Sequence, residues 1–185
     1  MASTTKIITA ITALENCSVD DTVTVSANAA ATEGSSVWLA EGEKLKLVDL
    51  LYALMLESGN DAAVAIAEHI SGSEGAFAAL MNETCKMAGA NSTNCVTASG
   101  LDDENHYTTA RDLALIARYA MQNDDFKKIV STQSYRIPWK GKGWDRSLKN
   151  HNKLLASYPG ANGIKTGYTK KSGRCLVSSA EKDGF

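Results

Sequence analysis

The sequence predicts an α+β fold in which strands near the end of the chain are combined with a mainly helical insert. The first observation is that apolar residues recur at helical spacing through the middle of the chain, with polar breaks between the segments. The second is that residues from 134 onward alternate in the manner of strands, separated by turns that contain glycine and lysine. The expected helices are 3–16, 47–57, 60–70, 74–88, 109–120 and 124–130, and the expected strands are 134–139, 144–148, 163–169 and 174–180, with 23–25 and 35–40 as short extended pieces.

Composition and charge narrow the classes of function. The chain has 185 residues, of which 44% are hydrophobic and 22% charged, and its net charge is −2. This length suits one substantial domain, and the net charge gives no electrostatic case for a nucleic-acid partner. No apolar run reaches the roughly 18 residues of a membrane helix. Threonines interrupt the first apolar segment, residues 6–14, too soon for a secretory signal, so we expect no export signal in this chain.

The cysteines and histidines form no familiar metal motif. None of the four cysteines belongs to a C-x-x-C pair, and the three histidines lie far apart in the sequence. We therefore expect small buried thiols, no metal and no cofactor. A Cys85–Cys95 disulfide is the alternative if the protein is exported. The residues concerned are Cys17, Cys85, Cys95, Cys175, His69, His106 and His151.

A hydroxyl and an amine lie three positions apart at the start of the first predicted helix, in Ser3 and Lys6. Because residues three apart share a helix face, their polar atoms can lie within the roughly 2.6–3.2 Å that a nucleophile and its base need. The free N–H groups of a helix start can also receive negative charge that develops on a carbonyl oxygen. The alternative is a serine-rich helix cap followed by a solvated lysine.

Two further segments favour the catalytic interpretation of Ser3 and Lys6 over the helix-cap alternative. Ser58-Gly59-Asn60 lies between two predicted helices, where it presents a hydroxyl and a carboxamide together or simply ends one helix and caps the next. Lys165-Thr166-Gly167 lies in a predicted strand, where lysine and threonine can hold a carboxylate and glycine permits close approach of another backbone. A phosphate loop is excluded because Ile164 stands where that motif needs glycine. The remaining alternative is an edge-strand lysine that hinders aggregation.

The order S-x-x-K, S-x-N, K-T-G is the set found in penicillin-binding proteins and serine β-lactamases. On this set and its flanking segments, the chain resembles the low-molecular-weight penicillin-binding proteins, the serine-type D-alanyl-D-alanine carboxypeptidases, over nearly its whole length. The resemblance implies a β-lactamase/transpeptidase-like fold, with an antiparallel sheet flanked by helices and an all-helical subdomain. The segments that carry it are 3–10, 56–63, 108–114, 150–155, 162–169 and 173–177.

The resemblance implies a catalytic role for the residues of the first two motifs. Ser3 would attack the carbonyl of the terminal D-Ala–D-Ala bond in a peptidoglycan pentapeptide, and Lys6 would take its proton. Ser58 and Asn60 would complete the proton relay and orient the substrate. A free lysine has a pKa of about 10.4, so burial and a second cation, Lys165, would have to lower the pKa of Lys6.

The resemblance assigns substrate binding to the third motif. Lys165 and Thr166 would bind the terminal carboxylate, and Gly167 and Tyr168 would belong to the same substrate-binding segment. The backbone N–H groups of Ser3 and Tyr168 would form the oxyanion hole. Penicillins and other β-lactam antibiotics would acylate Ser3 as mimics of the dipeptide.

The chain departs from the family pattern at both ends. Met1-Ala2 precedes the serine where the family usually has Pro-Ala, and the family has strands before that point and beyond Phe185. We therefore expect a single catalytic-domain fragment, 1–185, with an incomplete sheet and weak or absent activity. Its α/β lobe would be 1–22 and 150–185, and its mainly helical lobe 23–149. Open sheet edges would favour homo-oligomers, and the full-length protein would lie outside the cytoplasmic membrane, associated with the cell envelope.

Two alternatives to the carboxypeptidase stay open. A class A β-lactamase shares the motifs but needs a loop glutamate that positions water, and Glu74, Glu83 and Glu104 do not fit that pattern. Gly59, where lactamases prefer aspartate, also favours the carboxypeptidase. The second alternative is a catalytically silent module that binds peptidoglycan stem peptides. A nucleic-acid site around 139–146 receives little weight because the net charge opposes it.

Overall fold

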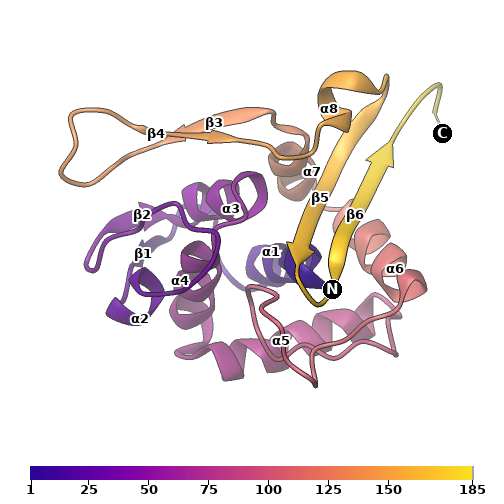
Figure 1. Ribbon diagram of the computed structural model, residues 1–185, viewed down its shortest axis with the longest axis horizontal. Helices are drawn as coiled ribbons and strands as arrows, with labels where there is room; N and C mark the ends of the chain where they lie inside the picture. The colour runs from indigo at the N-terminus through magenta and orange to yellow at the C-terminus, as the bar shows by residue number, and fades with distance from the viewer. Residues whose placement is uncertain (185) are drawn as a thin grey trace.

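The computed structural model describes residues 1–184 and has the expected α+β architecture. Figure 1 shows a cluster of helices with a long strand hairpin, β5–β6, along one side and a second hairpin, β3–β4, that extends over α3. The chain begins with a 3-10 turn, η1 (Ala2–Thr5), that runs directly into α1 (Lys6–Asn16). The other helices are α2 (Ala27–Ala30), α3 (Leu47–Leu56), α4 (Asn60–Ser71), α5 (Glu74–Met87), α6 (Ala110–Ala120), α7 (Asp124–Ser131) and α8 (Leu154–Ser157).

The strands form three two-stranded antiparallel sheets. In the longest, β5 (Ala161–Thr169) pairs with β6 (Gly173–Ala180), and Lys165 lies opposite Val177. The other two sheets pair β1 (Thr22–Thr24) with β2 (Lys44–Lys46) and β3 (Ser134–Ile137) with β4 (Arg146–Lys149). Among the described residues, no helix combines the length and the apolar character that a membrane span requires.

Helix α1 lies at the centre of the packing. All of its residues from Lys6 to Ala13 are buried, and the helix contacts α3, α4, α5, α6 and α7. The isoleucines of this segment, Ile7, Ile8 and Ile11, are at most 2% exposed and belong to one continuous core that includes α3 and α4. The buried position of α1 and its contact with β5 fix the first turn of the chain against the β5–β6 hairpin.

Most predicted elements are present, and the differences have local causes. The predicted helix 3–16 starts as a 3-10 turn and becomes α-helical only at Lys6. Asn60 is the first residue of α4 and not its cap; the cap position belongs to Gly59 and has no side-chain hydrogen bond. Residues 35–40 do not form the predicted extended piece: they pair with no strand, and Trp38 has a φ of +60°, because a carboxylate in α4 takes the N–H groups of Val37 and Leu39, as described below. The short helices α2 and α8 and the pairing of 44–46 with 22–24 were not predicted.

The four cysteines match the prediction of buried thiols only in part. Cys85 and Cys95 are buried, but Cys17 and Cys175 are partly exposed, so the prediction of buried thiols is wrong for these two. All four cysteines are free, and the alternative of a Cys85–Cys95 disulfide is not realised in the structure. A hydrogen bond with Cys85, together with burial, raises the pKa of the Cys95 thiol.

Candidate active site

The structure brings the hydroxyl of Ser3 and the amine of Lys6 together. Ser3 lies in η1 and Lys6 is the first residue of α1, and the Lys6 Nζ to Ser3 Oγ distance is 3.1 Å. The tight 3-10 turn places residues three apart on one side, so the expected contact forms although Ser3 precedes the α-helix. Thr4 Oγ1 donates to the Met1 carbonyl, which fixes this turn internally.

The amine of Lys6 is completely buried among uncharged oxygens. Besides Ser3, Nζ contacts the side-chain oxygen of Asn60 at 2.7 Å and the carbonyl oxygen of Ser99 at 2.5 Å. The side chain is 0% exposed, and no carboxylate lies within ion-pair distance of it in the described chain. Burial first, and the charge of Lys165 second, lower the pKa of Lys6 well below its usual value, against an opposite effect of Asp61 and Glu74.

Asn60 is held by the backbone of the segment before residue 36. Its amide nitrogen Nδ2 donates to the Glu33 carbonyl at 2.7 Å, and its backbone N–H donates to Ser35 O at 2.7 Å. Gly34 allows this contact, since a β-carbon there would lie 2.6 Å from Asn60 Nδ2. With Nδ2 engaged, the side-chain oxygen of Asn60 faces Lys6 as an acceptor.

Ser58 lies in the tight break between α3 and α4. Its φ of +64° is in the left-handed region, which a residue with a side chain adopts at a cost. The side chain is 6% exposed and lines the same cavity as Ser3. The strained turn therefore places a hydroxyl at the wall of the site, immediately before the helix that carries Asn60.

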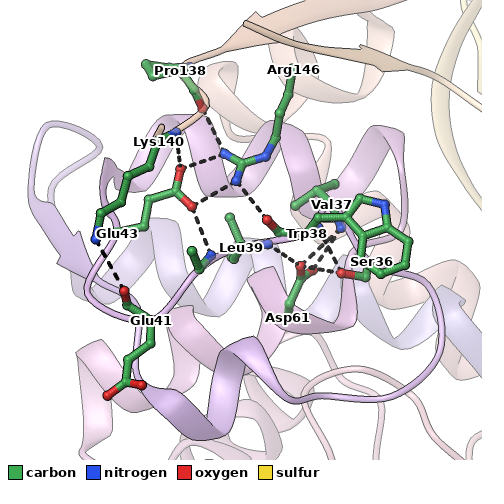
Figure 2. Close-up of polar contacts among 11 residues, drawn as sticks. Ser36, Val37, Trp38, Leu39, Glu41, Glu43, Asp61, Pro138, Lys140 and Arg146 are labelled. Carbon is green, nitrogen blue, oxygen red and sulfur yellow. Dashed lines mark hydrogen bonds and ion pairs between the residues drawn. The ribbon is translucent and has the colours of Figure 1, made fainter. Parts of the chain in front are cut away.

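Two buried carboxylates, Asp61 and Glu43, hold the segment 36–40 in place (Figure 2). Asp61, the second residue of α4, accepts hydrogen bonds from the N–H groups of Val37 and Leu39 at 3.1 Å and from Ser36 Oγ at 2.7 Å. This carboxylate explains why the N–H groups of Val37 and Leu39 need no strand partner.

The second carboxylate, Glu43, forms a bidentate ion pair with Arg146 of β4 at 2.7 and 2.8 Å. Arg146 also donates to the Trp38 carbonyl at 2.9 Å and to the Pro138 carbonyl at 2.8 Å, as Figure 2 shows. Both side chains are under 5% exposed. Hydrogen bonds from Arg146 and from the Ala40 N–H outweigh the opposing effect of burial and hold the pKa of Glu43 below its usual value.

Strand β5 brings the third motif close to Ser3. Lys165 is 1% exposed, and its Nζ donates to the Thr166 carbonyl at 2.9 Å; burial lowers its pKa to about 8. A β-carbon at Gly167 would lie 2.9 Å from the backbone nitrogen of Ser3, so the glycine is what lets β5 approach η1. This confirms the predicted close approach of another backbone at that glycine.

A cavity of about 230 Å³ has Ser3 in its lining. The amines of Lys6 and Lys165 are buried beside it and do not line it. Tyr168, whose side chain is 65% exposed, stands at its rim. The lining residues are Ser3, Ser35, Ser58, His151, Thr166, Gly167 and Tyr168. A larger hollow between α6 and β6 contains none of the motif residues.

Three contributors to the site were missed in the sequence. Ser99 supplies a carbonyl to Lys6, and His106 Nε2 lies 2.8 Å from Thr5 Oγ1 in the turn that carries Ser3. Burial, and next the N-terminal charge, lower the pKa of His106 to about 4, and its Nδ1 accepts the Val96 N–H. The third, His151, lines the cavity and contacts Glu57 at 3.3 Å.

A serine hydroxyl beside a buried lysine amine, with a second buried lysine nearby, defines the class of serine acyl-transfer sites that use lysine as the base. The comparisons with known proteins identify the family. The profile of the D-alanyl-D-alanine carboxypeptidases matches residues 1–185, and the chain belongs to this family.

Individual relatives agree with this assignment. The chain is 38% identical to D-alanyl-D-alanine carboxypeptidase DacF of Bacillus subtilis over 98% of its length and 48% of the relative's, so it spans about half of that protein. It is 38% identical to a D-alanyl-D-alanine carboxypeptidase of Streptomyces sp. strain K15, over 98% of this chain and 68% of the other.

The fold is also that of solved members of the family. A D-alanyl-D-alanine carboxypeptidase from Mycobacterium tuberculosis superposes with a TM-score of 0.93 at 35% identity, covering 99% of this chain and 69% of that one. A variant of the Streptomyces K15 DD-transpeptidase gives a TM-score of 0.92 at 34% identity, with 100% and 77% covered. The β-lactamase/transpeptidase-like fold predicted from the sequence is therefore confirmed.

Proposed function

We propose that this protein removes the terminal D-alanine from peptidoglycan stem peptides by way of an acyl-enzyme on Ser3, and that penicillins acylate the same hydroxyl. The observation that carries the proposal is the environment of Lys6. A neutral amine has two N–H donors and one lone pair. The oxygens of Asn60 and Ser99 take the two donors, and the lone pair then faces the Ser3 hydroxyl at 3.1 Å.

In this arrangement Lys6 acts as the general base. The Ser3 O–H donates its proton to Nζ while Oγ attacks the carbonyl carbon of the D-Ala–D-Ala bond. The proton then passes to the leaving nitrogen of D-alanine, and Ser58, at the cavity wall next to the helix of Asn60, relays it. Water hydrolyses the ester by the same steps in reverse.

Strand β5 supplies recognition of the substrate. Thr166 lines the cavity and donates to the terminal carboxylate, while the buried charge of Lys165 attracts that carboxylate from behind. The oxygen of the tetrahedral intermediate binds the backbone N–H groups of Ser3 and Tyr168. Gly167 is required here, because a side chain would separate the two donors.

The described part of the cavity favours a carboxypeptidase over a class A β-lactamase. A lactamase needs a glutamate that activates the deacylating water, and the cavity lining includes none in residues 1–184. Glu74 accepts the Ala98 N–H at 2.8 Å, and Glu83 lines a separate hollow beside Glu15. A long-lived penicilloyl-enzyme is the expected result.

A peptidoglycan substrate implies that the working protein lies outside the cytoplasmic membrane, at the cell envelope.

Association of two chains through the outer edges of β5 and β6 remains our prediction. Gel filtration tests it, and a monomer at all concentrations would contradict it.

The test is acylation by a fluorescent penicillin, followed by intact-mass and peptide mass spectrometry. We expect one adduct with the mass of the whole β-lactam, located on the peptide that contains Ser3, and no adduct in Ser3→Ala. Ser172→Ala is a matched control, since this serine lies in the turn between β5 and β6 and its hydroxyl accepts a hydrogen bond from the N-terminal amine at 3.4 Å, while its N–H donates to Thr169 Oγ1.

Other outcomes would overturn the proposal in distinct ways. Reversible binding of a D-Ala–D-Ala peptide without an adduct would indicate a binding module that lacks catalysis. Rapid turnover of the β-lactam with no accumulated adduct would indicate a lactamase. An adduct on another residue would remove Ser3 from its role.

A further inference from the structure

Three side chains with metal-binding atoms meet on the surface, away from the active site. The thiol of Cys17, a carboxylate oxygen of Asp21 and a ring nitrogen of His69 all lie within 4.8 Å of one another. Cys17 Sγ donates to Asp21 Oδ2 at 2.8 Å. Cys17 follows the last residue of α1, Asp21 lies in the turn before β1, and His69 is in the last turn of α4.

The backbone fixes two of the three donors before any ion arrives. The Cys17 N–H donates to the Ala13 carbonyl at 3.0 Å, and the Asp21 N–H donates to the Ser18 carbonyl at 3.0 Å. The Asp21 carbonyl accepts the Leu47 N–H at 2.9 Å, which ties the turn to the start of α3. Asp21 and His69 are exposed and Cys17 is partly exposed, so an ion reaches the cluster directly from solvent.

The donor set selects the kind of metal. Calcium and magnesium prefer oxygen ligands, whereas a thiolate, an imidazole and a carboxylate together are the ligands of zinc and similar divalent ions. A thiolate and a carboxylate supply two negative charges, which balance a divalent cation. Three protein ligands leave a fourth tetrahedral position for water.

We propose that Cys17, Asp21 and His69 bind one zinc ion that joins the far ends of the two helices whose first residues are Lys6 and Asn60. Helices α1 and α4 pack against each other, and the eleven residues of α1 span about 16 Å. The ion therefore lies too far from Ser3 to take part in its chemistry. It stabilises the folded chain by binding it in preference to the unfolded chain.

The experiment uses cobalt as a spectroscopic substitute for zinc. Titration of the reduced protein with Co²⁺ should give a thiolate-to-cobalt charge-transfer band and the visible bands of a tetrahedral ion, at one equivalent, and Zn²⁺ should displace them. Zn²⁺ should also raise the midpoint of thermal unfolding. Cys17→Ser should abolish the thiolate band, and His69→Ala should weaken zinc binding by about tenfold or more, as loss of a ligand costs at least as much as loss of its hydrogen-bond partner.

Two variants serve as controls. Cys175→Ser removes the other partly exposed thiol, and Asp20→Asn removes a neighbouring carboxylate that pairs with Lys46 and not with the cluster. Both should keep the cobalt spectrum and the zinc affinity. A thiolate band that persists in Cys17→Ser, a zinc affinity unchanged in His69→Ala, or no thiolate band in the wild-type protein at excess metal would each overturn the proposal. None of these outcomes depends on acylation of Ser3.

Discussion

Lys6 and Arg146 are both buried basic side chains, but they meet different partners. Arg146 faces the carboxylate of Glu43 through two short hydrogen bonds, and its two terminal nitrogens also donate to the carbonyls of Trp38 and Pro138. Lys6 faces only neutral oxygens, those of Ser3, Asn60 and Ser99. The first arrangement gives a buried charge its counter-charge, whereas burial of Lys6, together with the charge of Lys165, lowers the pKa of the Lys6 amine.

This difference distinguishes Arg146, a buried basic side chain that serves the structure, from Lys6, one that we propose takes part in the reaction. The guanidinium of Arg146, paired in a fixed geometry with Glu43, holds the β3–β4 hairpin to the segment around Trp38. An unpaired ammonium is costly to bury and loses its proton. Burial of a basic side chain thus serves the structure at Arg146, and at Lys6 it supports the proton acceptor that we propose.

The largest expected effect is on the rate of acylation in Lys6→Met. Loss of a general base typically slows a reaction by about 10²–10⁴-fold, and methionine fills most of the space that the lysine leaves. Rapid mixing with a fluorescent penicillin measures the rate, and Lys86→Met, at an exposed position of α5, is the control. A rate within threefold of the wild-type rate in Lys6→Met would remove the amine from its proposed role.

The second-largest expected effect is on the stability of the fold, and it concerns the buried ion pair of Glu43 and Arg146. Glu43→Gln leaves Arg146 buried without its counter-charge, which should lower the free energy of unfolding by about 3–5 kcal/mol. Replacing both residues with methionine should recover part of this loss, because no unpaired charge remains. Urea unfolding measures both variants. A loss under about 1 kcal/mol in Glu43→Gln would show that the pair contributes little.

A smaller effect concerns the pH dependence of stability. The pKa of Lys165 is about 8 in the folded chain against 10.5 for an ordinary lysine. Between these pH values the unfolded chain binds more protons than the folded one, so the free energy of unfolding should rise as pH rises from about 8 to 10.5. The slope of the free energy of unfolding against pH has contributions from both Lys165 and Lys6. Lys165→Met should remove the contribution of Lys165 and so make the slope smaller. A wild-type stability that is constant or falls over this range would contradict the prediction.

The smallest effect belongs to an exposed ion pair. Lys46 and Asp20 lie 2.7 Å apart, but their side chains are 58% and 74% exposed. Solvent and salt screen such a pair. Asp20→Asn should therefore leave the midpoint of urea unfolding unchanged, in contrast to Glu43→Gln. A clear destabilisation would mean that burial is not what distinguishes the two pairs.

The sequence allowed prediction of those parts of the site that depend on local spacing. Ser3 and Lys6 are three apart on one turn, and Gly167 indicated close approach of a backbone. The α+β class followed from helical spacing and strand alternation, and the family from three motifs in order.

Other features could not be predicted because they depend on contacts between distant segments. Nothing in the sequence around Ser99 or His106 marks them as neighbours of the first turn, and each reaches it through a loop. Glu43, directly before β2, pairs with Arg146 of β4. In the sequence each of these charged residues alone fits an exposed position. The 3-10 start of the first helix was missed because spacing of three fits both kinds of turn.

Titration of Lys6 in the folded, acylation-competent protein tests the central claim most directly. Lysine labelled with ¹³C at the ε-carbon gives one NMR signal per side chain, and the signal absent from Lys6→Met identifies Lys6. We predict a pKa well below the ordinary value, so that the amine is largely neutral at the pH of acylation. An ordinary pKa of about 10.4 would contradict the account of Lys6 as a base made by burial.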